Sequence, residues 1–265
     1  MLVVCDVDGT LVDKKKQLTD GNVAAVTRLR AAGIDFALIS ARPMSGMRWI
    51  AEKLDLDAPM GAFNGAVVFR RDGTIDQRET VTPDVAHGVL ALAAGAAVDV
   101  WVFADDRWYA STIEGDHVEH ERLASAQEPT VRADFADLTD SVDKIVLVSD
   151  DEPLLRELAA QAKARFGDAA TVVQSQTYYL DVTAKTGNKG DGIAALATAV
   201  GVPLDRTVAI GDQANDLAMF ARAGRSIAMG NATDAVKAAA SDTTTDNDHD
   251  GVAHAIDTLI LGRMM

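Results

Sequence analysis

The most constraining feature of this sequence is a pair of short apolar segments, each followed at once by polar residues. Residues 2–5 run into DVDGT, and residues 34–39 run into Ser40. Between them, residues 20–32 have the pattern of an amphipathic helix, with Thr19 as a candidate N-cap. Unbroken apolar strands that alternate with a helix are typical of a parallel sheet covered on both faces. The sequence therefore predicts an α/β fold.

The same order of elements returns near the end of the chain. The patterns there predict, in turn, a helix over residues 190–200, a strand over 207–210, a helix over 215–223, a short strand over 226–229 and a closing helix over 251–261. Both ends of the chain therefore supply elements of the same type. We expect them to build one doubly wound, Rossmann-like sheet together.

The middle of the chain has a different pattern. It predicts strand pairs, residues 98–103 with 108–111 and 171–174 with 178–182, and helices over 84–94 and 153–166. We interpret residues 83–184 as an inserted α+β domain. The core domain is then discontinuous and consists of residues 1–82 and 185–265.

Composition excludes several classes of protein. The 265 residues carry 40 acidic against 25 basic side chains, a formal net charge of −15, which lacks the basic excess that binding of a nucleic acid backbone needs. No apolar run reaches the ~18 residues of a membrane span. The single cysteine, Cys5, allows no internal disulfide and agrees with a reducing compartment. We expect a cytoplasmic protein without nucleic acid or membrane partners, and leave monomer and homodimer open.

The first apolar segment ends in two carboxylates, Asp6 and Asp8. Alternating residues of a strand share a face, so both can point into one crevice. A calcium loop would need Gly at its sixth position and Glu at its twelfth, where this chain has Leu11 and Gln17. Because buried carboxylates are costly unless they bind a cation, these two acids indicate a functional site.

Two further segments carry polar groups next to predicted strands or helices. Ser40 and Arg42 directly follow the second strand, and Lys189 in GNKGDG precedes a helix. Taken singly, a serine there is usually a turn former and a lysine is usually a solvated charge. The chain has no GxxxxGK[ST] run, so Lys189 is not a P-loop lysine.

The fourth segment is GDQAND. Asp212 ends a predicted apolar strand, as Asp6 does, and Asn215 and Asp216 open the next helix, where an aspartate is often only an N-cap. In open α/β sheets, ligands bind at the carboxyl ends of the strands. Together the four segments supply hard oxygen ligands, a nucleophilic carboxylate, a hydroxyl and an ammonium, which match phosphoryl transfer.

Taken in order, these motifs resemble those of the haloacid dehalogenase superfamily, in particular its Cof-type phosphatase branch with a C2-type α/β cap. The matching segments are DVDGTL, SAR at 40–42, NGA at 64–66, NKG at 188–190, GDQANDLAM, MGNA at 229–232 and DHDGVAHAI. The match spans the core and is weakest over the cap. One departure is Ala41, where the branch more often has Gly.

The resemblance implies roles for the carboxylates. Asp6 would attack phosphorus and form an aspartyl phosphate. Asp8 would protonate the leaving group and then deprotonate the attacking water. Mg²⁺ would be held by Asp6, by the backbone carbonyl of Asp8 and by Asp212.

The resemblance also implies which residues hold the phosphate. Lys189 would act as a catalytic cation oriented by Asp216, and Arg42 would touch the substrate near Asn64. The expected phosphate-binding residues are Gly9, Thr10, Ser40, Arg42 and Asn215.

The sequence therefore predicts a Mg²⁺-dependent phosphomonoester hydrolase that acts on a small phosphorylated metabolite through an aspartyl phosphate. Two alternatives stay open: a phosphomutase of the phosphomannomutase type, and a non-catalytic protein that binds magnesium or phosphate. Sugar phosphates, phosphoglycolate-like acids and esters of the pyridoxal phosphate type all remain open as substrates.

Overall fold

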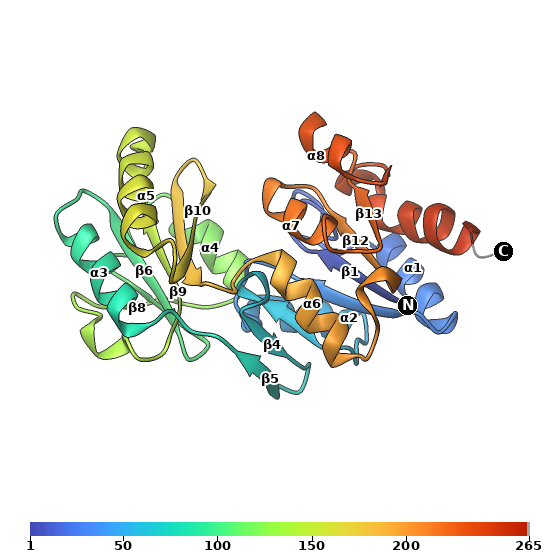
Figure 1. Cartoon of the computed structure of the whole chain (residues 1–265), viewed down its shortest axis with the longest axis horizontal. Coiled ribbons are helices and arrows are strands. Elements are labelled where there is room, and N and C mark those ends of the chain that lie inside the picture. The colour runs from blue at the N-terminus through green and yellow to red at the C-terminus, as the bar shows by residue number, and fades with distance from the viewer. Residues whose placement is uncertain (264–265) are drawn as a thin grey trace.

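Two β-sheets organise the protein, whose computed structural model describes residues 1–263 (Figure 1). The first sheet has eight strands in the order β14-β13-β12-β1-β2-β3-β4-β5. Their bounds are β1 Leu2–Asp6, β2 Asp35–Ile39, β3 Met60–Ala62, β4 Val67–Phe69, β5 Ile75–Arg78, β12 Thr207–Gly211, β13 Arg225–Ala228 and β14 Asp242–Thr243.

Strand β1 is central and pairs in parallel with β2 on one side and β12 on the other. The expectation that both ends of the chain build one α/β sheet is therefore confirmed. The hairpin additions β4 and β5 run antiparallel beside β3 and were not predicted. Both strands are short, and β5 has the largely exposed sequence IDQR. Neither is long enough to show the alternation of apolar and polar residues that identifies a strand in a sequence.

Helices cover both faces of the first sheet. They are α1 Asp20–Ala31, α2 Met44–Lys53, α6 Lys189–Ala199, α7 Leu217–Phe220, α8 Asp234–Ala239 and α9 Gly251–His254. Side chains of β1 alternate between two buried clusters, with Val3 and Cys5 on the side of α1 and Leu2 and Val4 on the side of α6. This two-sided burial explains why the strands are apolar without interruption.

Two predicted helices differ in detail from the structure. Residues 215–223 form a 3₁₀ turn, Ala214–Asp216, followed by the short α7. The closing helix begins with α9 and continues as a π-helical segment, Ala255–Ile260, and a 3₁₀ turn, Leu261–Arg263. Helix α2 was not predicted.

The second sheet has six strands in the order β10-β11-β9-β6-β7-β8. Their bounds are β6 Asp99–Ala104, β7 Arg107–Ala110, β8 Thr130–Val131, β9 Val142–Val148, β10 Ala170–Gln176 and β11 Tyr179–Ala184. Its helices are α3 Pro83–Ala94, α4 Val118–Ser125 and α5 Glu152–Phe166. The antiparallel pairs β6–β7 and β10–β11 confirm the predicted hairpins, whereas α4 was not predicted.

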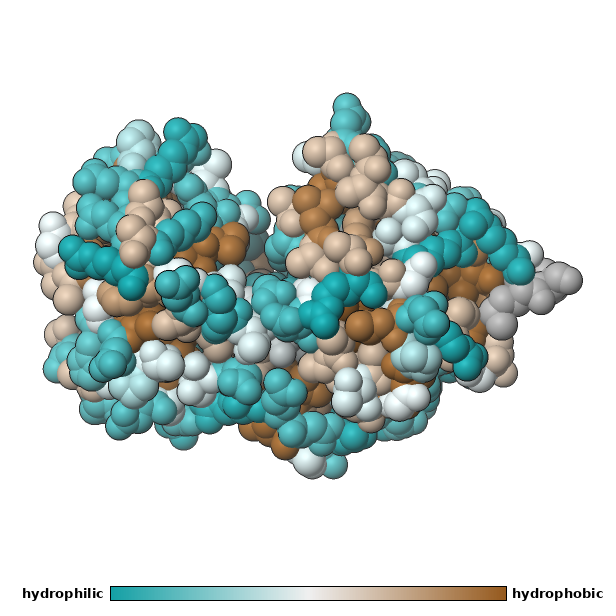
Figure 2. All heavy atoms as spheres, viewed as in Figure 1, coloured by the Kyte–Doolittle hydropathy of each residue, from teal (hydrophilic) through white to brown (hydrophobic). Residues whose placement is uncertain are grey.

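Helices α3 and α5 cover one face of the second sheet, and its other face turns toward the first sheet. Phe103 of β6 packs against Phe63, which follows β3, with ring centroids 5.9 Å apart. Helix α4 lies against α2, where the Ser45 hydroxyl donates to the Ser125 carbonyl at 2.6 Å. The space-filling view shows a notch between the two lobes (Figure 2). Within residues 1–263, none of the helices is both long enough and apolar enough to cross a bilayer.

Gly65 lies in the NGA turn and packs against helix α6, which allows a test of the contact between the turn and the helix. Its φ is +97°, and an added Cβ would lie 2.3 Å from the Cα of Gly192. Gly65→Ala should therefore lower the free energy of unfolding by roughly 2–4 kcal/mol in urea titrations, through backbone strain and overpacking. Gly33→Ala is the matched control, since Gly33 has a φ of +76° but open space around it. Equal losses in both variants would contradict the close approach of the turn to α6.

Candidate active site

The carboxyl ends of three parallel strands bring the predicted motifs to one edge of the first sheet. Asp6 is the last residue of β1, Ser40 follows β2 and Asp212 follows β12. Because β1 pairs in parallel with both neighbours, residues from distant parts of the chain meet there.

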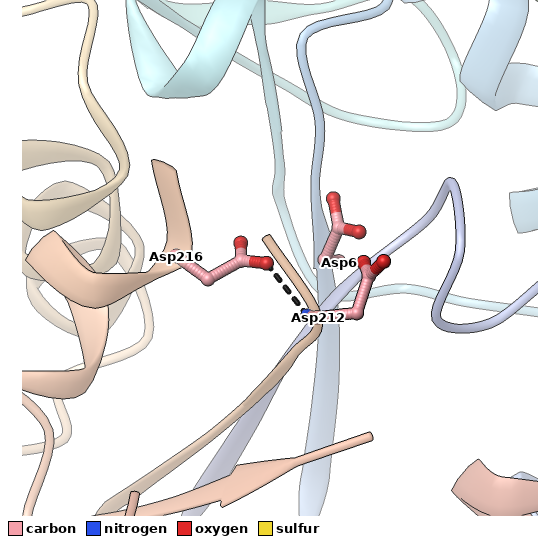
Figure 3. A group of neighbouring side chains, drawn as sticks. All are labelled: Asp6, Asp212 and Asp216. Carbon is pink, nitrogen blue, oxygen red and sulfur yellow. Dashed lines mark hydrogen bonds between the residues drawn. The ribbon is translucent and has the colours of Figure 1, made fainter. Parts of the chain in front are cut away.

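Asp6, Lys189 and Asp216 form a buried chain of ion pairs. The Lys189 ammonium, at the start of α6, donates to Asp6 Oδ1 at 2.5 Å and to Asp216 Oδ1 at 2.6 Å. Asp216 Oδ2 accepts from the backbone N–H groups of Asp212 at 2.8 Å and Gln213 at 2.9 Å, the first of which is drawn in Figure 3. Both oxygens of Asp216 are thus engaged, and they fix both the lysine and the loop.

Asp212 is held against the loop that follows β1. Its Oδ1 accepts from the Thr10 hydroxyl at 3.0 Å, and its Oδ2 accepts from Gln213 at 3.1 Å and Asn231 at 3.2 Å. Gly9 has a φ of +79°, and a Cβ there would lie 2.4 Å from Asp212 Oδ2. A glycine is therefore required for this approach. Asn231, in the MGNA segment, was not predicted as a site residue.

Three carboxylates offer oxygens within 4.8 Å of one another: Asp6, Asp212 and Asp216 (Figure 3). Burial raises the pKa of Asp6 well above its usual value. The Lys189 ammonium lowers this pKa, and the carboxylates of Asp216 and Asp212 raise it further. Burial and the charge of Asp216 raise the pKa of Asp212 to about 6. A divalent cation would relieve this crowding, and hard oxygens suit Mg²⁺. Both oxygens of Asp216 already accept from the Lys189 ammonium and from backbone N–H groups, whereas Asp6 uses one oxygen and Asp212 accepts only from neutral side chains. The side chains of Asp6 and Asp212 therefore fit best as ligands.

Asp8 is held by two cations. Arg42 donates to it in a bidentate manner, from Nε at 2.7 Å and Nη2 at 2.8 Å, and Lys16 donates at 2.6 Å. Burial raises the pKa of Asp8, but these hydrogen bonds and charges outweigh it and bring the pKa well below its usual range. Arg42, for which a substrate contact near Asn64 is predicted, pairs with Asp8 in the structure. Lys16 was not predicted, because it lies in a run of three lysines that resembles a solvated loop.

Ser40, Asn64 and Asn215 lie together beside the acids. The Ser40 carbonyl accepts from the Asn64 backbone N–H at 2.7 Å, and its buried hydroxyl accepts from the Arg42 N–H at 3.2 Å. The side-chain amide of Asn215 lies 3.5 Å from Asn64 Oδ1. The structure thus gathers all the predicted site residues at one edge, with Arg42 turned toward Asp8.

One buried carboxyl near the site lies outside every predicted motif. Glu121 is on α4, and burial raises its pKa from 4.5 to about 7. The Lys144 ammonium lowers this pKa, the carboxylates of Asp181 and Asp8 raise it further, and the Arg42 guanidinium lowers it. The burial of Glu121 could not be predicted from the sequence, because the helix that carries it, α4, was not predicted.

Glu121 should make stability depend on pH. Its carboxyl binds a proton more tightly in the folded than in the unfolded state, so folding loses stability as the pH rises from 4.5 to about 7. Glu121→Gln should therefore match the wild type below pH 4.5 and exceed its free energy of unfolding by roughly 2–4 kcal/mol at pH 8. Urea titrations at both pH values measure this difference. Glu119→Gln, at an exposed position on the same helix, should show no such change, and a pH-independent effect of Glu121→Gln would refute the assignment.

Comparisons with known proteins agree with this geometry. Residues 3–256 match the model of the haloacid dehalogenase-like hydrolase family. The HMP-PP phosphatase of Enterobacter sp. (strain 638) is 30% identical over 235 residues, which cover 87% of this chain and 84% of that one. The pyridoxal phosphate phosphatase YbhA of Escherichia coli (strain K12) is 26% identical, over 96% of this chain and 97% of its own.

A solved structure extends the likeness to the fold. The haloacid dehalogenase-like hydrolase from Bacteroides thetaiotaomicron superposes with a TM-score of 0.89 at 27% identity, over 97% of this chain and 98% of that one. Fold and relatives together define a phosphatase enzyme. The chain belongs to the haloacid dehalogenase-like hydrolase family, and the predicted resemblance to its Cof-type branch is confirmed.

Proposed function

We propose that this enzyme is a Mg²⁺-dependent phosphomonoester hydrolase that works through a phosphoryl group carried on Asp6. The observation that carries the proposal is the placement of Asp6. One carboxylate oxygen is fixed by Lys189, and within residues 1–263 the other has no hydrogen-bond partner. A carboxylate held by one oxygen at the edge of the sheet is oriented for attack on phosphorus.

The reaction then proceeds in two balanced steps. A carboxylate oxygen of Asp6 bonds to phosphorus while the bond from phosphorus to the leaving oxygen breaks, and Asp8 gives that oxygen a proton. Asp8 must take up this proton before the step, because its pairing with Arg42 and Lys16 keeps the resting carboxylate ionised. Asp8 next takes a proton from a water, which attacks phosphorus and releases Asp6 and inorganic phosphate. Arg42 is a positioning residue here, because its two hydrogen bonds fix the Asp8 carboxylate.

The phosphate oxygens would be held by the groups around Asp6. Lys189, Ser40 and Asn215 supply an ammonium, a hydroxyl and an amide, and the backbone at Gly9 and Thr10 approaches from the β1 loop. Asp216 positions the Lys189 ammonium through its hydrogen bond, and Asn64 lies beside the side-chain amide of Asn215 and positions it.

Asp6, Asp212 and the backbone carbonyl of Asp8 would hold the Mg²⁺ ion. When bound, the ion supplies positive charge that offsets the repulsion between a phosphate and a carboxylate nucleophile. Lys189 contributes to the same neutralisation from the side of α6.

Residues 83–184 would act as the cap, and residues 1–82 and 185–265 as the core. The hydrogen bond of Ser45 with Ser125 supports this role, because it holds α4 against α2, the helix that follows Arg42. A cap in this place would exclude water from the leaving group and contribute specificity. The lone thiol of Cys5 suits a reducing compartment, and we propose the cytoplasm.

The substrate class follows from the relatives, which are named for HMP-PP and pyridoxal phosphate. A small phosphorylated metabolite is therefore proposed for this chain. Phosphate release should be measured over a panel of such esters with Mg²⁺ and with excess EDTA. We expect release that requires Mg²⁺ and no acceptor. Absence of release from every ester, or transfer of phosphate only between positions of a sugar, would contradict the proposal.

A further inference from the structure

Three charged residues are buried on the side of the inserted region that faces the first sheet. Glu121 of α4, Lys144 of β9 and Asp181 of β11 are 7%, 6% and 7% exposed. Within residues 1–263, no ion pair or hydrogen bond joins any two of them. Buried charges that are not paired with an opposite charge are costly, so this arrangement indicates groups that are completed by a ligand.

The strand register shows that Lys144 and Asp181 share a face with aromatic residues. Asp181 lies opposite Val146, which lies opposite Trp101, and Lys144 lies opposite Phe103. Directly opposed residues of antiparallel strands point to the same side of the sheet. The face away from α3 and α5 therefore carries both charges and the aromatic rings.

This face adjoins the proposed catalytic edge. The Lys144 ammonium donates to the carbonyl of Ala41 at 3.4 Å, and Ala41 stands between Ser40 and Arg42. Glu121 lies near enough to Asp8 for that carboxylate to affect its pKa. A phosphate held at Asp6 would thus direct its alcohol part toward the charged face.

Several buried polar atoms on this face have no partner. Asp181 Oδ1 is an unpartnered acceptor, and the indole nitrogens of Trp101 and Trp108 are unpartnered donors within residues 1–263. The two indole rings meet edge to face with centroids 5.2 Å apart. Native proteins rarely leave buried polar atoms unpaired, and each one here can pair with a polar ligand.

We propose that Glu121, Lys144 and Asp181 form a leaving-group subsite that selects alcohols rich in hydroxyl or amino groups and rejects those with a second anionic group. The inference rests on the proposed function and states which leaving groups the enzyme prefers. Hydroxyl or amino hydrogens would pair with the two carboxylates, while Lys144 and the indoles donate to hydroxyl oxygens. At pH 8, above the pKa of Glu121, a carboxylate or second phosphate would meet two carboxylates against one ammonium, and the aromatic rings would pack on the carbon skeleton.

Matched pairs of substrates test this selectivity on the whole protein with Mg²⁺ at pH 8, where Glu121 is ionised. Each pair compares a sugar or polyol phosphate of three to six carbons with the acid of the same length, from glycerol 3-phosphate with 3-phosphoglycerate to glucose 6-phosphate with 6-phosphogluconate. For the best-cleaved chain length, kcat/KM should favour the neutral member by about 10-fold or more, as expected for mismatched polar contacts. Equal or better hydrolysis of the acid would overturn the proposal.

A double variant links the preference to these residues. Glu121→Gln combined with Asp181→Asn removes both negative charges and should bring the ratio between neutral and acidic substrates close to 1. Glu119→Gln, exposed on α4, should leave the ratio unchanged. A ratio in the double variant equal to that of the wild type would overturn the proposal, and the wild-type comparison stands even if this variant does not fold. Failure of the wild type to release phosphate from any member of these pairs or of the wider ester panel would instead contradict the proposed function itself.

Discussion

Asp6→Asn should lower kcat by about 10⁴-fold or more, because an amide is a poor nucleophile toward phosphorus and the reaction loses its covalent route. The amide occupies the same space as the carboxylate and can still accept a hydrogen bond from Lys189 through its oxygen. The fold and the binding of inorganic phosphate should therefore be retained. Steady-state kinetics, circular dichroism and calorimetric titration with phosphate measure the three properties.

The control for this substitution is Asp35→Asn. Asp35 is exposed at the start of β2, at the opposite end of the sheet from the candidate site. It should retain wild-type kcat within about twofold, since surface substitutions away from special features have small effects. An Asp6→Asn variant with more than a tenth of the wild-type kcat would remove Asp6 from its proposed role.

Lys189→Met should affect both stability and catalysis. The substitution leaves the buried carboxylates of Asp6 and Asp216 without their shared cation, which should lower the free energy of unfolding by about 3–5 kcal/mol. It also removes a donor to the phosphoryl oxygens, so kcat should fall by roughly 10²- to 10³-fold. Urea titration in EDTA isolates the loss of stability from any effect of bound metal.

The matched control is Lys163→Met on α5, where the lysine side chain is exposed in the last turn. This variant should change the free energy of unfolding by no more than about 0.5 kcal/mol and leave kcat unchanged. A Lys189→Met variant that unfolds at the same urea concentration as the wild type would show that the ammonium does not stabilise the buried acids.

The core of the fold and the main acids could be predicted because their signals are local. An apolar strand that ends in a carboxylate, as at Asp6 and Asp212, shows both its burial and its functional edge in a few consecutive residues. The hairpin strands of the inserted region could be predicted because their patterns are also local. Strands β4 and β5 were not, because three or four residues give too short a period to detect.

Contacts between separate elements could not be predicted from one sequence. The pairing of Arg42 with Asp8 and the approach of Lys16 depend on how the loops after β1 and β2 meet at the sheet edge. Lys144 and Asp181 appear in VDKIVLV and YLDVTA as charged residues within largely apolar strands. Only the register of β9 with β11 and the packing of that face against the first sheet show that they are buried together.

The most direct test of the account is chemical trapping of the phosphorylated enzyme. The enzyme should be mixed with Mg²⁺ and a good substrate, quenched in acid and treated with borohydride, which reduces an acyl phosphate to an alcohol. Mass spectrometry of the peptide that contains residue 6 should then find homoserine in place of Asp6. Trapping at another residue, or unmodified Asp6 in enzyme that carries trapped phosphate, would contradict catalysis through an aspartyl phosphate at this position.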